Sequence, residues 1–324
     1  MFTVKDLTVS IGPDTQPIDI VSGVSFSIAA GEVLGLVGES GCGKSMTSLA
    51  AMGLLPRPGP RIRSGRILVD GADVTFLEPW QRVEQGHGSI AMIFQEPMTS
   101  LNPVRRIGDQ IEEAIRVREK LSDRAVAGRA RELLELVRIP DAALQLSAFP
   151  HQMSGGMRQR VMIAIALASR PQVLIADEPT TALDVTVQFQ ILGLLRELCD
   201  RFSMAMLFIT HDMGVIAQLA DRVAVMYAGR IVETAPAGTL FGAPSHPYSR
   251  SLMACMPIRG VGSDRLRTIA GQAPAPGAIR IGCTFAPRCP DARETCRVEP
   301  PRQTALTDGH MALCTYPITD GRPL

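Results

Sequence analysis

The chain of 324 residues carries nearly balanced charge, with 33 Lys and Arg against 32 Asp and Glu. Domains that hold a long nucleic-acid backbone usually have a basic excess, so this balance argues against nucleic acid as the partner. Hydrophobic residues make 46% of the chain, which is ample for a buried core, and 29 glycines with 24 prolines do not indicate low complexity. The N-terminal ten residues lack an apolar signal segment, and every apolar run is far shorter than the ~20 residues of a membrane-spanning helix. We therefore expect a folded, cytoplasmic protein.

The predicted elements alternate between strands and helices over the larger N-terminal part of the chain. Residues 2–9 alternate apolar with polar side chains, which is typical of a half-buried strand. Residues 33–37 form an apolar run that leads into a glycine-rich turn and a helical pattern over 44–55. Further buried strands are predicted at 90–94, 173–176 and 206–209. This alternation predicts an α/β fold.

Two changes of pattern divide the chain. Ile107, Ile111 and Ile115 recur every four residues, so residues 97–170 are predicted to be a mainly helical insertion. After residue 243, prolines become frequent and periodicity fades beyond a short helix expected near 248–255. We therefore expect one domain over residues 1–243 and a small, loop-rich C-terminal extension over residues 244–324.

The segment from Gly38 to Ser45 fits the phosphate-loop pattern G-x4-G-K-[ST], with a predicted strand before it and a helix after it. Glycines let consecutive backbone N–H groups turn toward phosphate oxygens, and a helix N-terminus favours an anion. Lys44 would bind the β- and γ-phosphates, and the Ser45 hydroxyl would bind Mg²⁺. The alternative, an ordinary strand-to-helix turn, does not explain the complete pattern.

Two carboxylates follow another buried strand. Asp177 and Glu178 come directly after the apolar run 173–176, at the end of a strand where α/β proteins place their ligand sites. Asp177 would hold Mg²⁺, usually through water, because hard cations prefer oxygen ligands. Glu178 would act as general base toward water. A solvated strand end remains the alternative for this segment taken alone.

Three weaker elements stand in a fixed order around these motifs: Gln95 after a strand, the triplet Ser154-Gly155-Gly156 before a helix, and His211 after a strand. Together with the phosphate loop and the acid pair, they make the chain resemble the ATP-binding subunits of ABC transporters over essentially its whole length. The fold implied is an ABC-type nucleotide-binding domain, with a RecA-like core, a β-subdomain and the helical insertion. It would be followed by the small Cys-containing C-terminal domain.

The resemblance assigns roles to individual residues. Glu178 would be the catalytic base, while His211 and Gln95 would complete the catalytic set; Ser45, Gln95 and Asp177 would hold Mg²⁺. ATP would lie between two subunits paired head to tail, so that one subunit's signature segment contacts the other's nucleotide. The implied nucleotide-binding residues are Gly38, Glu39, Ser40, Gly41, Cys42, Gly43, Lys44, Ser45, Met46, Ser154, Gly155, Gly156 and Asp184.

Further segments resemble the dipeptide and oligopeptide importer branch, among them residues 94–103, His246-Pro247-Tyr248 and the Cys-rich tail. This likeness implies ATP-driven peptide import, by a peripheral subunit on the cytoplasmic face of the inner membrane. The implied partners are a second ABC ATPase, two transmembrane permeases and an extracytoplasmic solute-binding protein, with no nucleic acid. Related importers carry nickel, glutathione or short sugars. A soluble ABC-type ATPase acting on DNA or ribosomes and a non-catalytic regulatory cassette are further alternatives.

Two departures from the family pattern stand out. Ile11 occupies the region where an aromatic residue usually stacks on adenine, which leaves Phe2 as one possible replacement. Met153 and Met157 replace the usual signature leucine and glutamine. Lys44, Glu178 and His211 are all present, and this favours an active hydrolytic site.

The C-terminal extension contains Cys283, Cys289, Cys296 and Cys314. Four cysteines in a chain without a secretory signal suggest a metal or redox site. Their spacing matches neither a zinc ribbon nor a ferredoxin, so the residues leave zinc and an iron–sulfur cluster open. The family resemblance favours a 4Fe–4S cluster, with zinc as the alternative.

Overall fold

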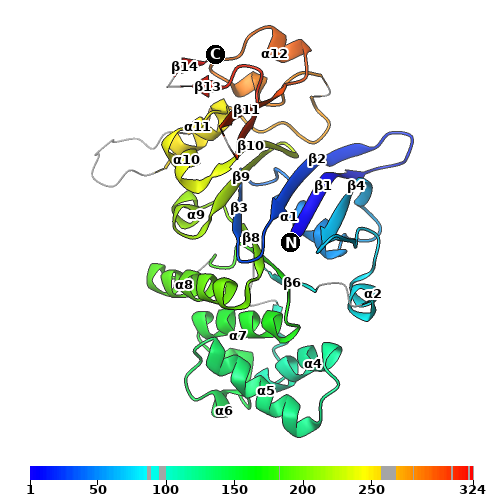
Figure 1. Cartoon of the computed structure of the whole chain (residues 1–324), viewed down its shortest axis with the longest axis vertical. Coiled ribbons are helices and arrows are strands. Elements are labelled where there is room, and N and C mark those ends of the chain that lie inside the picture. The colour runs from blue at the N-terminus through cyan, green and yellow to red at the C-terminus, as the bar shows by residue number, and fades with distance from the viewer. Residues whose placement is uncertain are drawn as a thin grey trace. The chain divides into compact units, whose positions relative to one another are not determined.

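The computed structural model describes the chain except for residues 86–88, 95–99, 182, 257–267, 280, 308, 320–321 and 324 (Figure 1). It divides into two compact units. The first unit comprises Met1–Phe2, Ile28–Glu32 and Val69–Phe208; the second comprises Thr3–Ser27, Val33–Leu68 and Ile209–Leu324. None of the helices in the described part has the length and apolar character needed to cross a bilayer.

The second unit contains a mixed sheet in the strand order β11-β12-β10-β9-β3. Strand β3 (Val33–Val37) is buried throughout and runs parallel to β9 (Arg222–Tyr227), with Leu34 opposite Arg222. Strand β10 (Arg230–Pro236) returns antiparallel to β9 through a tight turn at Ala228 and Gly229, both of which have positive φ. The other strand bounds are β11 Gln303–Thr307, β12 His310–Leu313, β13 Ile318–Thr319 and β14 Arg322–Pro323.

A second group of strands in this unit runs in the order β2-β1-β4. Their bounds are β1 Phe2–Ile11, β2 Ile18–Ile28 and β4 Arg61–Val69. The helical elements are α1 Lys44–Met52, α9 Met213–Leu219, α10 Ala237–Gly242, α11 Pro247–Ala254, the 3-10 turn η2 Ala286–Arg288, and α12 Thr295–Val298. Helix α1 ends three residues before the predicted limit, because Gly53 adopts a left-handed conformation that closes it.

An aromatic cluster forms the centre of the C-terminal part of the second unit. The rings of Tyr227 in β9 and Tyr248 in α11 lie 4.5 Å apart, and Phe285, just before η2, packs edge-on against Tyr227 at 5.2 Å. All three side chains are fully buried. Offset and edge-to-face contacts of this kind stabilise beyond the area that they bury. The cluster therefore fastens the segment around η2 to the sheet.

The first unit contains strands in the order β8-β7-β6. Strand β7 (Val173–Asp177) runs parallel to β6 (Ile90–Ile93), and β8 spans Ala205–Ile209. The helical elements and the remaining short strand are β5 Ala72–Asp73, α2 Pro79–Glu84, α4 Ile107–Arg118, α5 Asp123–Leu136, α6 Ala142–Gln145, η1 Pro150–Gln152, α7 Gly155–Ala168 and α8 Val185–Phe202.

Helices α4, α5 and α7 pack on one another in the first unit, and Figure 1 shows them together with α6. The isoleucines that predicted a helix, Ile107, Ile111 and Ile115, all face this contact and are fully buried. The four-residue spacing of these isoleucines in the sequence therefore corresponds to the buried face of α4.

Candidate nucleotide-binding site

Residues 38–45 connect β3 to α1 in the second unit. Each glycine in this loop has positive φ, at 155° for Gly38, 77° for Gly41 and 108° for Gly43. A Cβ on Gly38 would lie 2.1 Å from the carbonyl oxygen of Met226, and one on Gly43 would lie 2.8 Å from the Met226 Cε atom. Only glycine fits at positions 38 and 43, where a side chain would meet both strain and collision, whereas at Gly41 the positive φ alone disfavours a side chain.

The start of α1 fits an anion. Among the residues that the structure describes, the backbone N–H groups of Gly43, Lys44 and Ser45 donate to no protein acceptor. Lys44 is only 7% exposed, and its Nζ donates to the carbonyl oxygens of Gly38 at 2.8 Å and Glu39 at 3.1 Å. Unpaired donors at a helix N-terminus, beside a buried ammonium group held by carbonyls, suit a polyphosphate.

Cys42 lies inside the same loop and is buried. Burial raises the pKa of its thiol, and the neighbouring Lys44 opposes that rise. The Cys42 carbonyl accepts a hydrogen bond from the N–H of Gly229 at 2.9 Å, which ties the loop to the β9–β10 turn. Cys42 therefore acts as a small packing residue that helps to fix the loop.

His211 lies in the second unit beside the phosphate-loop strand. Thr210, the residue before it, donates its backbone N–H to Leu36 in β3 at 3.4 Å. Asp212, the residue after it, caps α9 by accepting from the N–H groups of Gly214 and Val215. The backbone hydrogen bond from Thr210 to Leu36 places His211 near the C-terminal end of β3, where the phosphate loop begins. The α/β folds place their ligand sites at the C-terminal ends of strands.

The acid pair lies in the first unit at the end of β7. Asp177 is the last residue of a fully buried strand, and Glu178 follows it with φ of 47°. The left-handed conformation of Glu178 turns the chain sharply after the strand, and its carboxylate accepts a hydrogen bond from the Thr181 hydroxyl at 3.1 Å. Glu178 shares this left-handed conformation with seven other non-glycine residues among those that the structure describes.

The structure brings the signature segment and the Asp184 segment together in the first unit. Ser154 caps α7 by accepting from the N–H of Met157, and Asp184 caps α8 by accepting from the N–H of Val187 at 2.9 Å. A Cβ on Gly156 would lie 2.7 Å from a methyl carbon of Val187. The two helix starts are therefore packed as closely as glycine allows. Gln95, the remaining predicted catalytic residue, lies outside the described residues.

Sequence reasoning missed a contact to the phosphate loop from the far end of the chain. Arg288 in η2 forms a two-pronged ion pair with Glu39, and the Tyr248 hydroxyl accepts the Glu39 N–H at 3.0 Å. No local pattern marks this pair, because 249 positions separate Arg288 from Glu39.

The substitute suggested for the missing adenine-stacking residue is ruled out by burial. Phe2 is fully buried in the core, so its ring is not available to a nucleotide. Ile11, at the end of β1, is partly exposed.

The prediction of an iron–sulfur cluster is wrong for the described residues, which contain no group of three or more His, Cys, Asp or Glu side chains able to hold a metal ion. The same absence among the described residues leaves the alternative, a zinc site, without a ligand set. Burial raises the pKa of Cys289 to about 12 and that of Cys314 to about 11, and it also raises the pKa of Cys283.

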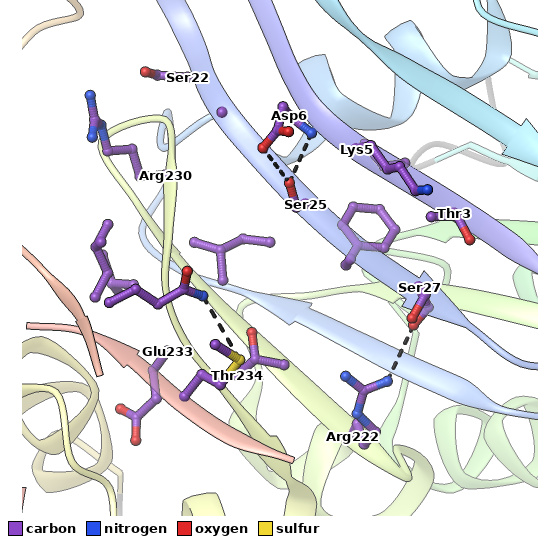
Figure 2. A pocket seen from close by; sticks show the side chains of 18 of the residues that line it. Thr3, Lys5, Asp6, Ser22, Ser25, Ser27, Arg222, Arg230, Glu233 and Thr234 are labelled. Carbon is purple, nitrogen blue, oxygen red and sulfur yellow. Dashed lines mark hydrogen bonds between the residues drawn. The ribbon is translucent and has the colours of Figure 1, made fainter. Parts of the chain in front are cut away.

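A cavity of about 710 Å³ also lies in the second unit, lined by β1, β2, β10 and the C-terminal strands (Figure 2). None of the predicted site residues lines it. Its polar groups pair with one another: the Ser25 hydroxyl donates to the Asp6 carboxylate at 3.0 Å, and Arg222 donates to the Ser27 carbonyl at 3.2 Å (Figure 2). The phosphate loop therefore remains the candidate site of this unit.

Comparisons with known proteins agree with this arrangement. Residues 21–181 match the family described as ABC transporter, and residues 232–296 match the oligopeptide/dipeptide transporter C-terminal region. The dipeptide transport ATP-binding protein DppD of Escherichia coli is 46% identical, over 100% of this chain and 99% of its own length. The oligopeptide transport ATP-binding protein AppD of Bacillus subtilis is 46% identical, over 92% of this chain and 91% of its own.

Solved structures share the cassette fold. The dimeric bacterial ABC transporter cassette MJ0796 is 26% identical and superposes with a TM-score of 0.63, over 73% of this chain and 99% of that one. A post-hydrolysis form of the same cassette, bound to ADP and phosphate, matches equally well. The cbiO1 protein of Clostridium perfringens gives a TM-score of 0.64 at 26% identity, over 75% of this chain and 90% of that one. The chain therefore belongs to the ABC transporter family, in the branch of oligopeptide and dipeptide ATP-binding subunits, and it is an ATPase that binds ATP with Mg²⁺.

Proposed function

We propose that this chain hydrolyses ATP to power peptide import through an ABC transporter. The observation that carries the proposal is the full-length likeness to dipeptide and oligopeptide transport ATP-binding proteins, which includes the specialised C-terminal region. The chain works as a peripheral subunit on the cytoplasmic face of the inner membrane. Its partners are a second ATPase, two permeases and a solute-binding protein. The names of these relatives refer to peptides. Nickel, glutathione and short sugars are therefore not favoured as the transported solute, and nucleic acid is not favoured as a partner.

The phosphate loop binds the nucleotide in this proposal. Free N–H groups at the start of α1 donate to phosphate oxygens, and the Lys44 ammonium group adds a positive charge that its carbonyl partners do not neutralise. Ser45, Asp177 and Gln95 would supply the oxygen ligands of Mg²⁺, and the cation would neutralise phosphate charge. Oxygen donors of this kind match the preference of that cation.

Glu178 serves as the general base. Its carboxylate accepts a proton from water as the water oxygen attacks the γ-phosphorus, and the bond from that phosphorus to the ADP oxygen breaks. The left-handed backbone and the bond from Thr181 support this role, because both restrict where the carboxylate lies. His211 orients the water and the γ-phosphate.

Ser154, Gly155 and Gly156 bind the γ-phosphate held by the partner ATPase. Their position at the start of α7 supports this assignment, because the first N–H groups of a helix face an incoming anion. Asp184, at the start of the adjoining α8, belongs to the same nucleotide-binding set, and the close packing of the two helix starts supports this assignment.

Residues 244–324 form a small Cys-containing C-terminal domain after an ABC domain over residues 1–243, with the helical subdomain at 97–170. The match of residues 232–296 to a named C-terminal region supports a distinct C-terminal part, although the match begins before residue 244. The aromatic cluster of Tyr227, Tyr248 and Phe285 supports its firm attachment.

Gentle purification of the tagged chain from its own membranes, followed by mass spectrometry, tests the proposal. We expect two permeases, a second ATPase and a solute-binding protein to copurify. Recovery of nucleic-acid or ribosomal proteins without membrane subunits would overturn the transport assignment and leave the ATPase intact.

A further inference from the structure

Glu39, the second residue of the phosphate loop, is held by the C-terminal part of the chain. The guanidinium group of Arg288 donates to both of its carboxylate oxygens, with Nη1 to Oε2 at 2.8 Å and Nη2 to Oε1 at 3.0 Å. The Arg288 side chain is only 7% exposed and that of Glu39 is 25% exposed. Two parallel, charge-assisted bonds with little solvent around them fix both position and orientation.

Arg288 is itself fixed from several directions. Its Nε donates to the carbonyl of Ala270 at 2.9 Å, its Nη1 donates to the Tyr227 hydroxyl at 3.3 Å, and its guanidinium lies over the Tyr227 ring. The bond to Glu39 raises the pKa of Arg288 further above its usual range, so the group stays charged. The Arg288 guanidinium group is therefore held in one position within the C-terminal part and carries a permanent positive charge.

The backbone of Glu39 is held as firmly as its side chain. Its N–H donates to the hydroxyl of Tyr248, which is fully buried in the aromatic cluster. Its carbonyl oxygen accepts from Nζ of Lys44 at 3.1 Å. A continuous chain of hydrogen bonds therefore runs from Arg288 through Glu39 to the lysine of the phosphate loop.

We propose that Arg288 is a positioning residue for ATP binding, which acts through Glu39 and couples the C-terminal part to the nucleotide site. It holds the Glu39 carbonyl where Lys44 needs it, and it neutralises a carboxylate that would otherwise repel the triphosphate. The inference rests on the proposed role of the phosphate loop. Without Arg288, the loop loses an anchor and gains an unbalanced negative charge beside its anion site.

The test measures ATP affinity and steady-state kinetics on the purified complex that contains the full chain. In Arg288→Gln, we expect the Kd and KM for ATP to rise about tenfold while kcat stays within about twofold, since a charge-assisted pair is lost but no reacting group is. Arg288→Lys keeps the positive charge but cannot donate two parallel hydrogen bonds, so its Kd and KM for ATP should lie between those of Arg288→Gln and the parent. Arg302→Gln, at an exposed arginine of the same part, is the matched control and should leave both constants unchanged.

A second substitution separates positioning from a general loss of structure. Adding Glu39→Gln to Arg288→Gln removes the unbalanced carboxylate, so at least half of the lost affinity, on a logarithmic scale, should return. A double variant as weak as Arg288→Gln would overturn the inference, and so would an Arg288→Gln variant that behaves like Arg302→Gln. A Lys44→Ala variant tests the phosphate-loop assignment separately from the role of Arg288. If Lys44→Ala binds ATP with the affinity of the parent, residues 38–45 do not form the phosphate site.

Discussion

Glu178 shows most directly how a single residue carries the proposed chemistry. We predict that Glu178→Gln lowers ATP turnover by at least about a hundredfold, because the amide cannot accept a proton from water. ATP affinity should stay near that of the parent, because the change leaves the phosphate loop untouched and keeps the side-chain shape. Turnover by phosphate release and affinity by titration give the two readings. Hydrolysis at the parent rate would show that another group serves as the base.

At this residue scale, local sequence was a good guide wherever one short segment contains the whole feature. The path of the loop from Gly38 to Ser45 could be predicted because its glycine positions, lysine and flanking elements are contiguous, and in the structure its glycines all have positive φ before α1 begins. The contact between Glu39 and Arg288 could not, because chain topology alone brings these residues together. The suggested ring of Phe2 failed for a similar reason: burial depends on what packs above a strand.

At the element scale, α7 and α8 interlock through Gly156 and Val187. We predict that Gly156→Ala destabilises the parent by about 1 kcal/mol, since overpacking against Val187 outweighs the better helix propensity of alanine. In a Val187→Ala background the same change should stabilise, because the new methyl group then fills space. Chemical unfolding of all four variants measures this reversal of sign.

Gly128 provides the control for this cycle. It lies in α5, and nothing is within 4 Å of a Cβ built on it. Gly128→Ala should therefore stabilise by a similar, small amount in both backgrounds. If Gly156→Ala has the same effect with and without Val187, the close packing of the two helix starts is not the cause.

Helix α11 is capped at its N-terminus by a buried histidine, His246, whose protonation should affect stability. Burial lowers the pKa of His246 from 6.5 to about 3, and its Nδ1 accepts the N–H of Tyr248 at 3.0 Å. Between these two pKa values the unfolded chain binds a proton that the folded chain excludes. Stability should therefore fall as pH decreases from about 6.5 toward 3, by up to ~1.4 kcal/mol per pH unit from this group.

His246→Asn tests that prediction, since an asparagine can cap the helix but does not titrate. The free energy of unfolding should depend less steeply on pH in this variant between pH 6.5 and 5 than in the parent. His151→Asn, at an exposed histidine, is the control and should keep the parent slope. An unchanged slope in His246→Asn would contradict the buried, neutral state of His246.

Predicted and observed elements agree best where burial follows from local pattern. The predicted strands over 33–37 and 206–209 and the helical period of Ile107, Ile111 and Ile115 all appear in the structure. The C-terminal extension was expected to be loop-rich, yet it contributes β11 and β12 to the sheet beside β10. These short strands gain stability from pairing with distant partners such as Glu233 and Thr234, so a local pattern gives little sign of them.

At the scale of the whole molecule, one buried carboxylate joins the C-terminal strands to the cassette sheet within the second unit. Glu233 in β10 is 1% exposed and accepts the N–H groups of Ser245 and His246 and the ring nitrogen Nε2 of His310, at distances of 2.7 to 2.9 Å. Three donors, two in the segment just before α11 and one in β12, thus depend on a single side chain. Removing one acceptor oxygen leaves a buried donor without a partner.

We predict that Glu233→Gln lowers the free energy of unfolding by about 1–3 kcal/mol. Denaturant titration measures the loss, and Glu299→Gln at an exposed glutamate serves as the matched control. A Glu233→Gln variant as stable as Glu299→Gln would mean that the buried carboxylate does not hold the C-terminal strands in place.

The most direct test of the central claim is ATP-driven uptake by the purified transporter complex in proteoliposomes. ATP is placed on the side of this subunit, and a labelled dipeptide is supplied with the solute-binding protein on the other. We predict uptake that requires ATP and that disappears with Glu178→Gln, although the complex still assembles and binds ATP. Uptake that continues at the parent rate with Glu178→Gln, or no uptake by a parent complex that hydrolyses ATP and holds all its subunits, would contradict the account.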